Sequence, residues 1–279
     1  MTENIEKYLV VNGVRLRYFD WGNETKPVMV CLHGHTGDSS IWIEFAEAMS
    51  PHYRVLTVDQ RGHGGSGWAE DGYSRDRFVD DLAVFIDTLG LSRVTLVGLS
   101  MGGWNTLLYT PLHPTIVEKA VIVDIAPEAS EESKQMWGSR PPTPLEFDSF
   151  EHAIRWGREY SPWSTDARYQ IDMRAKLHER EDGKWTWNAD PVLYNMQLED
   201  NRSEDLINRY WASLSKFTCP ILEVRGGESP LVSDTIIDRM KQANETYFSS
   251  VTVDGAGHVV PVDRPEEFID VVGEFLGIS

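Results

Sequence analysis

One serine, Ser100, lies in the stretch GLSMGG at residues 98–103, where its spacing from three glycines suits nucleophilic chemistry. The strand-forming run RVTLV comes before this stretch, and the helical pattern WNTLLY comes after it. Where a strand turns abruptly into a helix, the residue at the turn adopts strained backbone angles, and side chains two positions away would clash. The pattern therefore predicts a turn that exposes the Ser100 hydroxyl at a helix N-terminus. The alternative is a purely structural turn with an idle serine.

A histidine that can serve Ser100 as a general base is found near the end of the sequence. His258 lies in GAGHVVPVDRPEEF, in a predicted loop between the last strand and the last helix. The small residues at 255–257 keep that loop tight and leave the imidazole free. Because an imidazole changes its charge near neutral pH, His258 is the predicted base. The alternative is a histidine of a surface loop.

Two backbone N–H groups are predicted to stabilise a negatively charged oxygen beside Ser100. The apolar run VMVCL ends in HGHTG, and an unhindered Gly34 lets the backbone fold over the nucleophile. The N–H of His35 and the N–H of Met101 then form the predicted oxyanion hole, in which one donor typically lowers a barrier by about 3 kcal/mol. The alternative is that this stretch is only a turn, with the His35 side chain lining a pocket.

The elements that must position these residues alternate between strand and helix. Residues 1–127 open with a hairpin about Asn12 and continue with apolar strands and amphipathic helices, and the alternation resumes over residues 217–279. Residues 128–216 contain no clear buried strand and several helical stretches. This pattern predicts an α/β fold with a mostly parallel twisted sheet flanked by helices, and an inserted helical lid over 128–216. Ligands of such sheets bind at the carboxyl ends of the strands.

The composition and charge of the sequence exclude several classes of partner. The net charge of −18 argues against a nucleic-acid or anionic-membrane partner, because both require a basic surface. The sequence has no basic-then-apolar leader and no apolar run long enough to span a membrane, so we expect a cytoplasmic protein. It has neither a clustered Cys/His set nor a phosphate-binding glycine loop, so it implies no metal and no organic cofactor. A small-molecule substrate is the expected partner.

Four stretches in this order, LHGHTGDSSIW, DQRGHGGSG, GLSMGG and GAGHVVPVDRPEEF, resemble the α/β-hydrolase family over nearly the whole sequence. The resemblance is highly specific for the α/β-hydrolase fold. It is less specific for the substrate, because the family includes esterases, lactonases, thioesterases, dehalogenases, epoxide hydrolases and C–C bond hydrolases. The dehalogenase and epoxide-hydrolase branches carry an aspartate nucleophile, so Ser100 favours the remaining branches.

The resemblance leaves the position of the triad acid open. Family members usually carry this acid after the strand that follows the lid, in a pattern like G-x-x-D, and the stretch GGES puts Ser229 there instead. A serine cannot hold an imidazolium electrostatically. The candidate carboxylates are Asp124, Glu228, Asp234 and Asp254. Asp234 is also a plausible helix start, and Asp254 lies only four residues before His258.

We favour Asp124, which ends the strand AVIVD just before the predicted lid. Neighbouring parallel strands lie about 5 Å apart, so an acid can move from the end of one strand to the next and still reach the histidine. Some family members that this sequence resembles place the acid there: (acetamidomethylene)succinate hydrolase-like members, cofactor-free ring-cleaving dioxygenases and zearalenone-type lactonases. Glu228 and Asp234 remain the alternative acids, and in that case Asp124 only shapes a turn.

Aromatic and cationic side chains near these motifs are the candidate pocket residues. Trp42 follows the predicted oxyanion loop and Trp104 follows the nucleophile, so both are expected to line the pocket. Arg140 and Arg155 are candidates for binding a substrate carboxylate, against the alternative of a solvated lid surface. Of the alternating pair in KWTWN, at most one tryptophan is expected to face the pocket.

The predicted activity is acyl transfer from a small, largely apolar carboxylic ester or lactone to Ser100, followed by hydrolysis of the acyl-enzyme. The resemblance around Asp124 and Ser229 keeps amide, enamide or C–C bond hydrolysis open as an alternative. Cofactor-free dioxygenation, with His258 and Asp124 as the base, is a third possibility. The empty post-lid acid position also leaves open a non-catalytic binding module on the same fold. The sequence indicates no oligomeric state.

Overall fold

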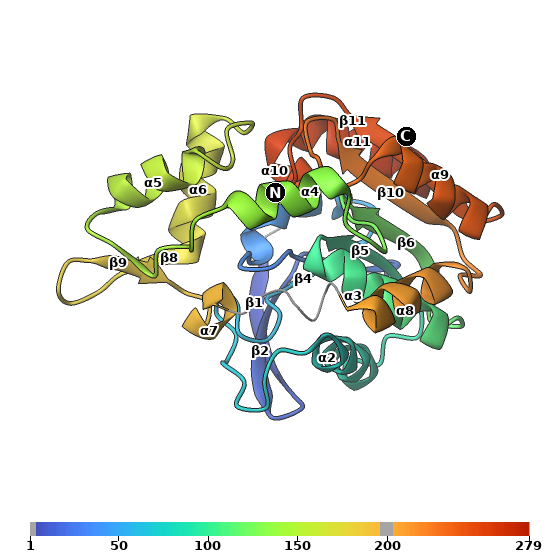
Figure 1. Cartoon of the computed structure of the whole chain (residues 1–279). Coiled ribbons are helices and arrows are strands. Elements are labelled where there is room, and N and C mark those ends of the chain that lie inside the picture. Colours follow the sequence, from blue (N-terminus) through green and yellow to red (C-terminus); the bar gives the residue numbers. More distant parts are fainter. Residues whose placement is uncertain (1–3, 196–202, 279) are drawn as a thin grey trace.

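A computed structural model describes residues 4–195 and 203–278 of this protein, and its main feature is an eight-stranded sheet (Figure 1). The strand order is β1-β2-β4-β3-β5-β6-β10-β11. Strands β1 and β2 pair antiparallel around a turn at Asn12 and Gly13, both with positive φ, and β2 pairs antiparallel with β4. All pairs from β4 to β11 are parallel. The strands are β1 Ile5–Val11, β2 Val14–Asp20, β3 Val28–Leu32, β4 Arg54–Val58, β5 Val94–Leu99, β6 Val117–Val123, β10 Ile221–Gly226 and β11 Phe248–Val253.

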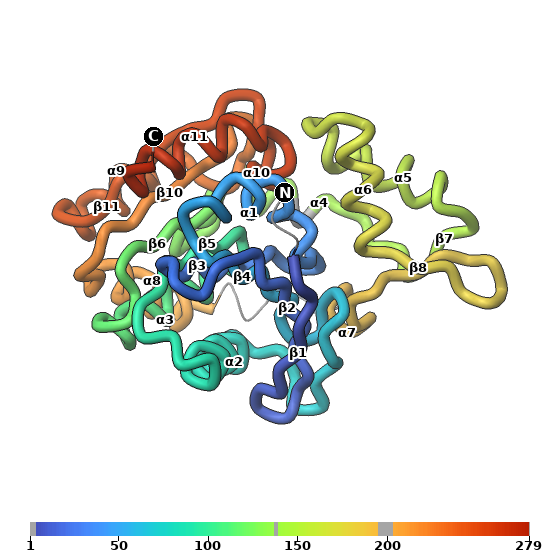
Figure 2. The backbone as a smooth tube through the Cα atoms, turned by 180° about the vertical axis from the view of Figure 1, so that it is seen from behind, coloured from blue at the N-terminus to red at the C-terminus, as the bar shows by residue number. Residues whose placement is uncertain are grey.

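Helices cover both faces of this sheet, which confirms the predicted fold class. Successive residues of β3 alternate between two cores: Val30 and Leu32 belong to one, and Met29 and Cys31 to the other. The first core is closed by α2 Arg75–Thr88, α3 Met101–Tyr109, α8 Glu204–Leu214 and α9 Asp234–Ala243. The second is closed by α1 Ile43–Met49, α10 Val260–Asp263 and α11 Pro265–Leu276, with α1 visible in the reverse view (Figure 2). Short 3₁₀ turns, η1 Ser39–Trp42 and η2 Thr110–Leu112, complete the element order.

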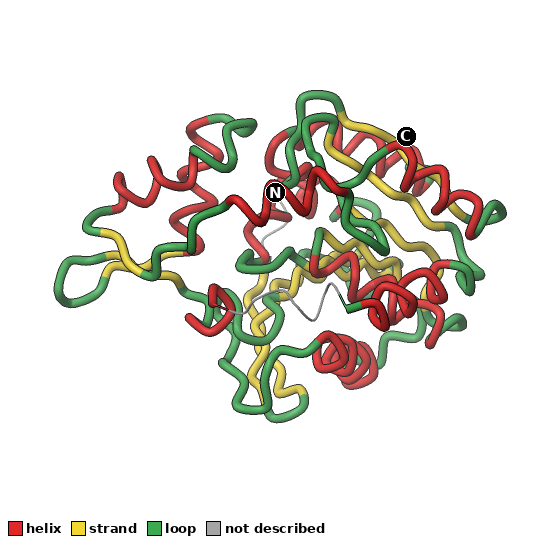
Figure 3. The backbone as a smooth tube through the Cα atoms, in the orientation of Figure 1, coloured by secondary structure: helices red, strands yellow, loops and turns green. Residues whose placement is uncertain are grey.

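The part of the chain from α4 to α7 is called the insert below, and its α5, α6 and short strands form a lobe beyond the sheet (Figures 1 and 3). It includes a three-stranded antiparallel sheet that the sequence reading did not anticipate. These strands have only two or three residues each, too few to show a period-two pattern. Phe147, Phe150, Tyr169 and Trp187 make a small core between this sheet and the helices. The elements are α4 Glu131–Ser139, β7 Glu146–Phe147, α5 Phe150–Arg158, α6 Asp166–Lys176, β8 Leu177–Glu179, β9 Trp185–Trp187 and α7 Pro191–Asn195.

Helix α8 lies inside the range 128–216 that was predicted as the lid, yet it packs on the sheet domain. Leu206, Tyr210 and Leu214 are buried in the first core, and the Tyr210 ring stacks on Trp104 of α3 with centroids 6.0 Å apart. The division into residues 1–127, 128–216 and 217–279 stays a prediction. The packing of α8 favours an end of the insert before residue 204.

The insert is fastened to the sheet domain by an arginine of α6. The Arg168 guanidinium pairs with the Glu44 carboxylate of α1 at 2.7 Å and donates to the Ser40 carbonyl of η1 at 2.9 Å. Arg168 is buried, and both of its partners follow the loop after β3 in the chain.

Among the helices of residues 4–195 and 203–278, none is both long and apolar enough to cross a bilayer.

Candidate active site

Ser100 occupies the turn between β5 and α3, with φ 52° and ψ −113°. A Cβ atom at Gly98 would lie 2.3 Å from the Gly102 carbonyl oxygen, and one at Gly102 would lie 2.2 Å from the Leu32 carbonyl oxygen. Both contacts are with backbone, which cannot move aside, so only glycine fits at either position. The glycine spacing thus allows β5 and α3 to meet closely enough to hold Ser100 in a strained conformation.

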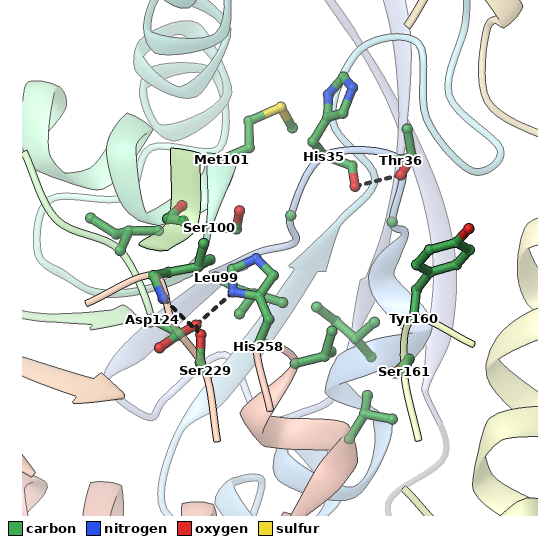
Figure 4. Close-up of a pocket in the computed structure, with 18 of the residues that line it drawn as sticks. His35, Thr36, Leu99, Ser100, Met101, Asp124, Tyr160, Ser161, Ser229 and His258 are labelled. Carbon is green, nitrogen blue, oxygen red and sulfur yellow. Dashed lines mark hydrogen bonds and ion pairs between the residues drawn. The ribbon is translucent and has the colours of Figure 1, made fainter. Parts of the chain in front are cut away.

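Asp124 and His258 meet at the carboxyl edge of the sheet (Figure 4). Asp124 follows β6, is fully buried and has φ 50°. Its Oδ2 lies 2.7 Å from Nδ1 of His258. A carboxylate only accepts hydrogen bonds, so Nδ1 carries the proton and Nε2 is left with the free lone pair of a base. Strand β6 neighbours β10, and the Asp124 N–H donates to the Val224 carbonyl at 2.9 Å, which fixes the acid beside the strand that usually carries it.

Two groups, one at the end of β10 and one in the loop after it, hold the Asp124 carboxylate. The Ser229 hydroxyl donates to Oδ2 at 2.5 Å, and the Gly226 N–H donates to Oδ1 at 3.1 Å. Ser229 therefore stands where an acid was expected and supports the acid on the neighbouring strand. Hydrogen bonds to a charged acceptor are among the stronger ones, so these two contacts fix the orientation of the carboxylate.

The other candidate acids lie away from His258. Glu228 is exposed, and its backbone N–H donates to the Ala256 carbonyl. Asp234 is the first residue of α9, and its exposed carboxylate pairs with Arg225 at 2.5 Å. Asp254 is exposed in the turn after β11. Within the described part of the chain, Asp124 is the carboxylate whose contact with the His258 ring is recorded.

A second buried carboxyl, Glu223, was missed by the sequence reading. It lies on β10 opposite Ile122, is fully buried, and accepts from the Ile125 N–H at 3.3 Å through Oε1. Its Oε2 is buried and has no hydrogen-bond partner among residues 4–195 and 203–278. Burial, and then the adjacent Asp124 charge, raise the pKa of Glu223 well above its usual value. A glutamate inside the apolar run PILEV was the available signal.

The loop after β3 passes close to Ser100, as predicted for an oxyanion loop. A Cβ atom at Gly34 would lie 3.2 Å from the Ser100 Cβ. His35 and Met101 both line the pocket, and neither backbone N–H donates to another described residue. The His35 ring points away from Ser100 (Figure 4), and its Nε2 contacts the Leu193 carbonyl of α7 at 2.9 Å. Burial lowers the pKa of His35 to about 4, so the neutral ring donates this bond from Nε2.

The pocket is a cavity of about 450 Å³ between the carboxyl edge of the sheet and the insert. Ser100, His258 and Asp124 line it on the sheet side. The Ser100 hydroxyl makes no hydrogen bond in the described part of the chain, so it is available to a substrate in the cavity. Catalytic hydrogen bonds are often long in unliganded enzymes and tighten when substrate binds.

Of the two tryptophans predicted to line the pocket, the structure places one there. Trp104 lines the cavity, and its Nε1 donates to the Ala126 carbonyl at 2.9 Å. Trp42 is wrong as a pocket residue: it is fully buried in the second core, with its ring 5.9 Å from Phe45 and 6.1 Å from Phe268. The turn η1 directs its side chain under α1 and α11 rather than over the sheet edge.

The insert residues divide in the same way. Arg140 lines the cavity over the Tyr160 ring, 4.9 Å from the centroid, and burial lowers its pKa. Arg155 is wrong as a pocket residue, because α5 buries Ala153 on the face turned inward and leaves Arg155 exposed. Of the pair on β9, Trp187 lines the cavity and Trp185 is not among its lining residues, as expected from their alternation.

Asp38, at the end of the oxyanion loop, carries an unusual carboxyl group. It is 2% exposed, and its Oδ1 accepts from the Ser40 N–H at 2.8 Å. Burial, and then the nearby Asp59 charge, raise its pKa to about 6 from an ordinary 3.8. A carboxyl pKa that is higher in the folded state costs stability above that pKa, and the cost disappears as the pH falls to the unfolded value.

We therefore expect Asp38→Asn to stabilise the protein only at higher pH. Asparagine can keep the hydrogen bond to Ser40 without the charge, so the free energy of unfolding should rise by about 3 kcal/mol at pH 8, at about 1.4 kcal/mol per pH unit, and by little near pH 4. Urea unfolding at the two pH values measures the difference. The exposed Glu24 gives the control variant Glu24→Gln, which should show no such gain. Equal shifts of Asp38→Asn at both pH values would contradict the assignment.

Comparisons with known proteins identify the family. A sequence profile described as "Alpha/beta hydrolase family" matches residues 29–271. A 3-hydroxybutyrate-oligomer hydrolase from Cupriavidus necator is 28% identical, over 94% of this chain and 93% of its own length. A 2-(acetamidomethylene)succinate hydrolase from Mesorhizobium japonicum is 29% identical, over 90% and 88% respectively. The crystal structure of E-2-(acetamidomethylene)succinate hydrolase has the same fold, with a TM-score of 0.88 at 24% identity over 99% of this chain and 100% of the other. The chain therefore belongs to the α/β-hydrolase family and is a hydrolase.

Proposed function

We propose that this hydrolase cleaves a small, largely apolar carboxylic ester or lactone through an acyl-enzyme on Ser100. The observation that carries the proposal is the 2.7 Å contact between His258 Nδ1 and Asp124 Oδ2, at the rim of a cavity that Ser100 also lines. That contact leaves Nε2 as the basic nitrogen, on the side of the ring away from the acid. Two relatives that are named hydrolases support the reaction class.

In the proposed first step, Nε2 of His258 takes the hydroxyl proton while Ser100 Oγ attacks the carbonyl carbon. The N–H groups of His35 and Met101 donate to the oxyanion that develops. The tetrahedral intermediate collapses, the bond to the alcohol oxygen breaks, and the imidazolium returns its proton to the leaving alcohol. Asp124 stabilises the imidazolium and keeps the ring in one tautomer.

In the second step, water replaces the alcohol. His258 removes a proton from this water, the resulting hydroxide attacks the acyl carbon, and the bond to Ser100 Oγ breaks with return of the proton to the serine. The carboxylic acid leaves, and the free enzyme is restored. A cavity of about 450 Å³ lies in the range typical of small-molecule sites, which favours a compact substrate.

Amide or enamide hydrolysis is the second candidate. One relative is named for an (acetamidomethylene)succinate, a substrate with carboxylate groups. The half-buried Arg140 guanidinium on the cavity wall has the charge and geometry to bind a carboxylate. The same three residues would perform the chemistry, with an amine or enamine as the leaving group.

A serine-reactive phosphonate tests the proposed function. We expect one covalent adduct per chain, on the peptide that contains Ser100, and loss of activity in proportion to labelling. Short p-nitrophenyl esters should then be turned over rapidly by unlabelled protein if an ester is the substrate. Near silence with these esters, together with turnover of an N-acyl enamine dicarboxylate, would favour the second candidate. An adduct elsewhere, or activity that survives labelling, would overturn both.

A further inference from the structure

The insert side of the cavity carries polar atoms that the proposed chemistry does not use. Asp172 and Lys176 lie one turn apart on α6, and both line the cavity. Lys176 Nζ donates to Asp172 Oδ2 at 2.7 Å. Asp172 is 5% exposed, and its other oxygen, Oδ1, is buried without a hydrogen-bond partner in residues 4–195 and 203–278. Tyr194 of α7 lines the same cavity, and its hydroxyl is likewise buried without a partner in those ranges. We call Asp172, Lys176 and Tyr194 the polar wall.

The polar wall lies beside the oxyanion loop. The residue before Tyr194, Leu193, accepts the hydrogen bond from the His35 ring at 2.9 Å. The charges of Lys176 and Asp172 both act on the pKa of Asp38, at the end of that loop, so both lie near it. Ser100 and the polar wall line the same cavity, so a bound substrate can contact both.

The chemistry of the polar wall selects one kind of substrate group. A buried carboxylate oxygen without a donor costs free energy, which a ligand O–H or N–H would recover. The Tyr194 hydroxyl and the remaining N–H bonds of Lys176 can donate to the same ligand group. The charges of Lys176 and Asp172 cancel, and Asp38 adds a carboxyl behind them, so an incoming carboxylate finds no net attraction. The substrate group that fits the polar wall is therefore neutral and can both donate and accept hydrogen bonds.

We propose that the polar wall is a specificity site that binds a hydroxyl group of the substrate. The substrate class is then a hydroxylated ester, with the hydroxyl on either the acyl or the alcohol part, rather than a wholly apolar ester. This inference rests on the proposed function for its identity as a substrate site. It adds Asp172 and Tyr194 as specificity-determining residues, without a part in bond making or breaking.

Matched esters test the proposal through ratios of kcat/KM. Methyl esters of 3-hydroxybutanoic and 6-hydroxyhexanoic acid are compared with methyl butanoate and hexanoate, and 2-hydroxyethyl and 4-hydroxybutyl acetate with ethyl and butyl acetate. We expect at least one hydroxylated ester to exceed its parent by roughly 10-fold, the effect of one hydrogen bond to a charged group.

Three variants assign any preference to the polar wall. Asp172→Asn and Tyr194→Phe keep side-chain shape, and each should reduce the hydroxyl-to-parent ratio severalfold while the parent ester is still cleaved. Asp166→Asn, an exposed position on the same helix, should leave the ratio unchanged. If esters are cleaved but no hydroxylated ester exceeds its parent, or the ratio survives both cavity variants, the proposal is wrong.

An equilibrium measurement separates this inference from the proposed function. In Ser100→Ala protein, hexane-1,6-diol and 1-hexanol are titrated by calorimetry or NMR, which needs no turnover. The affinity ratio of diol to alcohol should fall by roughly 10-fold when Asp172→Asn is added. A ratio that does not change overturns the polar wall as a hydroxyl site even if ester hydrolysis is established. A ratio that falls supports the site even if no ester is hydrolysed.

Discussion

Replacing Asp124 with asparagine is expected to lower kcat by about ten-thousandfold while the fold stays intact. Asparagine can still accept a hydrogen bond from the His258 ring, but its NH₂ group can also donate, which favours the wrong tautomer, and it provides no charge to stabilise the imidazolium. Steady-state kinetics with the best ester, and a thermal melt to show that the variant is folded, measure the two effects.

The controls for this prediction are the acids at the more usual place. Glu228→Gln and Asp234→Asn should change kcat by less than about twofold, because neither carboxylate contacts His258 in the described part of the chain. A large loss in either of these variants, with activity kept in Asp124→Asn, would mean that a different carboxylate orients the histidine.

The loop after β10 also allows a rescue experiment. The Ser229 hydroxyl lies 2.5 Å from the same Asp124 oxygen that contacts the histidine, so a carboxylate at position 229 would lie near the ring. We expect the kcat of the double variant Asp124→Asn/Ser229→Asp to be at least tenfold higher than the kcat of Asp124→Asn. Recovery in that variant, without recovery in Asp124→Asn/Thr235→Asp, which adds the same charge at an exposed position of α9, would show that position matters rather than added charge.

The second large effect is expected at the nucleophile itself. Ser100→Ala and Ser100→Gly should both abolish turnover to the level left by substrate binding and the oxyanion hole, a loss of roughly 10⁶-fold. They should differ in stability, because the backbone at Ser100 has φ 52° and ψ −113°. A residue with a Cβ is strained there by about 1–3 kcal/mol, and glycine avoids this strain. Part of the resulting stabilisation is offset by the greater entropy of glycine in the unfolded state.

We therefore expect the free energy of unfolding of Ser100→Gly, measured by urea titration, to be about 1 kcal/mol higher than that of Ser100→Ala. The comparison between two inactive variants cancels the loss of the hydroxyl and leaves the backbone term. Equal stability, or a less stable glycine variant, would show that the turn stores no strain at this residue. The loss of turnover in both variants is measured independently of this difference in stability.

The sequence was most informative where backbone geometry restricts the choice of residue. A Cβ atom added at Gly34 or at the glycines around Ser100 would lie within about 3.3 Å of neighbouring backbone or of Ser100 itself. Glycine is therefore required there, and the glycine pattern of the sequence predicts both loops. Asp124 was favoured because neighbouring parallel strand ends lie close together and because the sequence resembles family members with an acid there. In the structure, β6 and β10 are neighbours. These features depend on local spacing or on the parallel sheet, and both can be read from a single sequence.

Side-chain direction in irregular segments was not readable in the same way. Trp42 lies on a 3₁₀ turn and Arg155 on a nine-residue helix. A rotation of about 120° per residue in the first and about 100° in the second decides whether each side chain faces the cavity. Glu223 was hidden for a different reason: its partner, the Ile125 N–H, is far away in sequence and close only because β6 and β10 pair. Contacts between distant segments of this kind need the folded chain.

Asp124, the proposed acid, lies directly before the insert, with only residues 125–130 between it and α4. Two contacts clamp that short connection: Trp104 holds the Ala126 carbonyl, and the Ser130 hydroxyl donates to the Pro230 carbonyl at 2.5 Å. These contacts fix the segment between Asp124 and α4 on the sheet domain. We therefore expect a displacement of α5 and α6 to leave the contact between Asp124 and His258 unchanged.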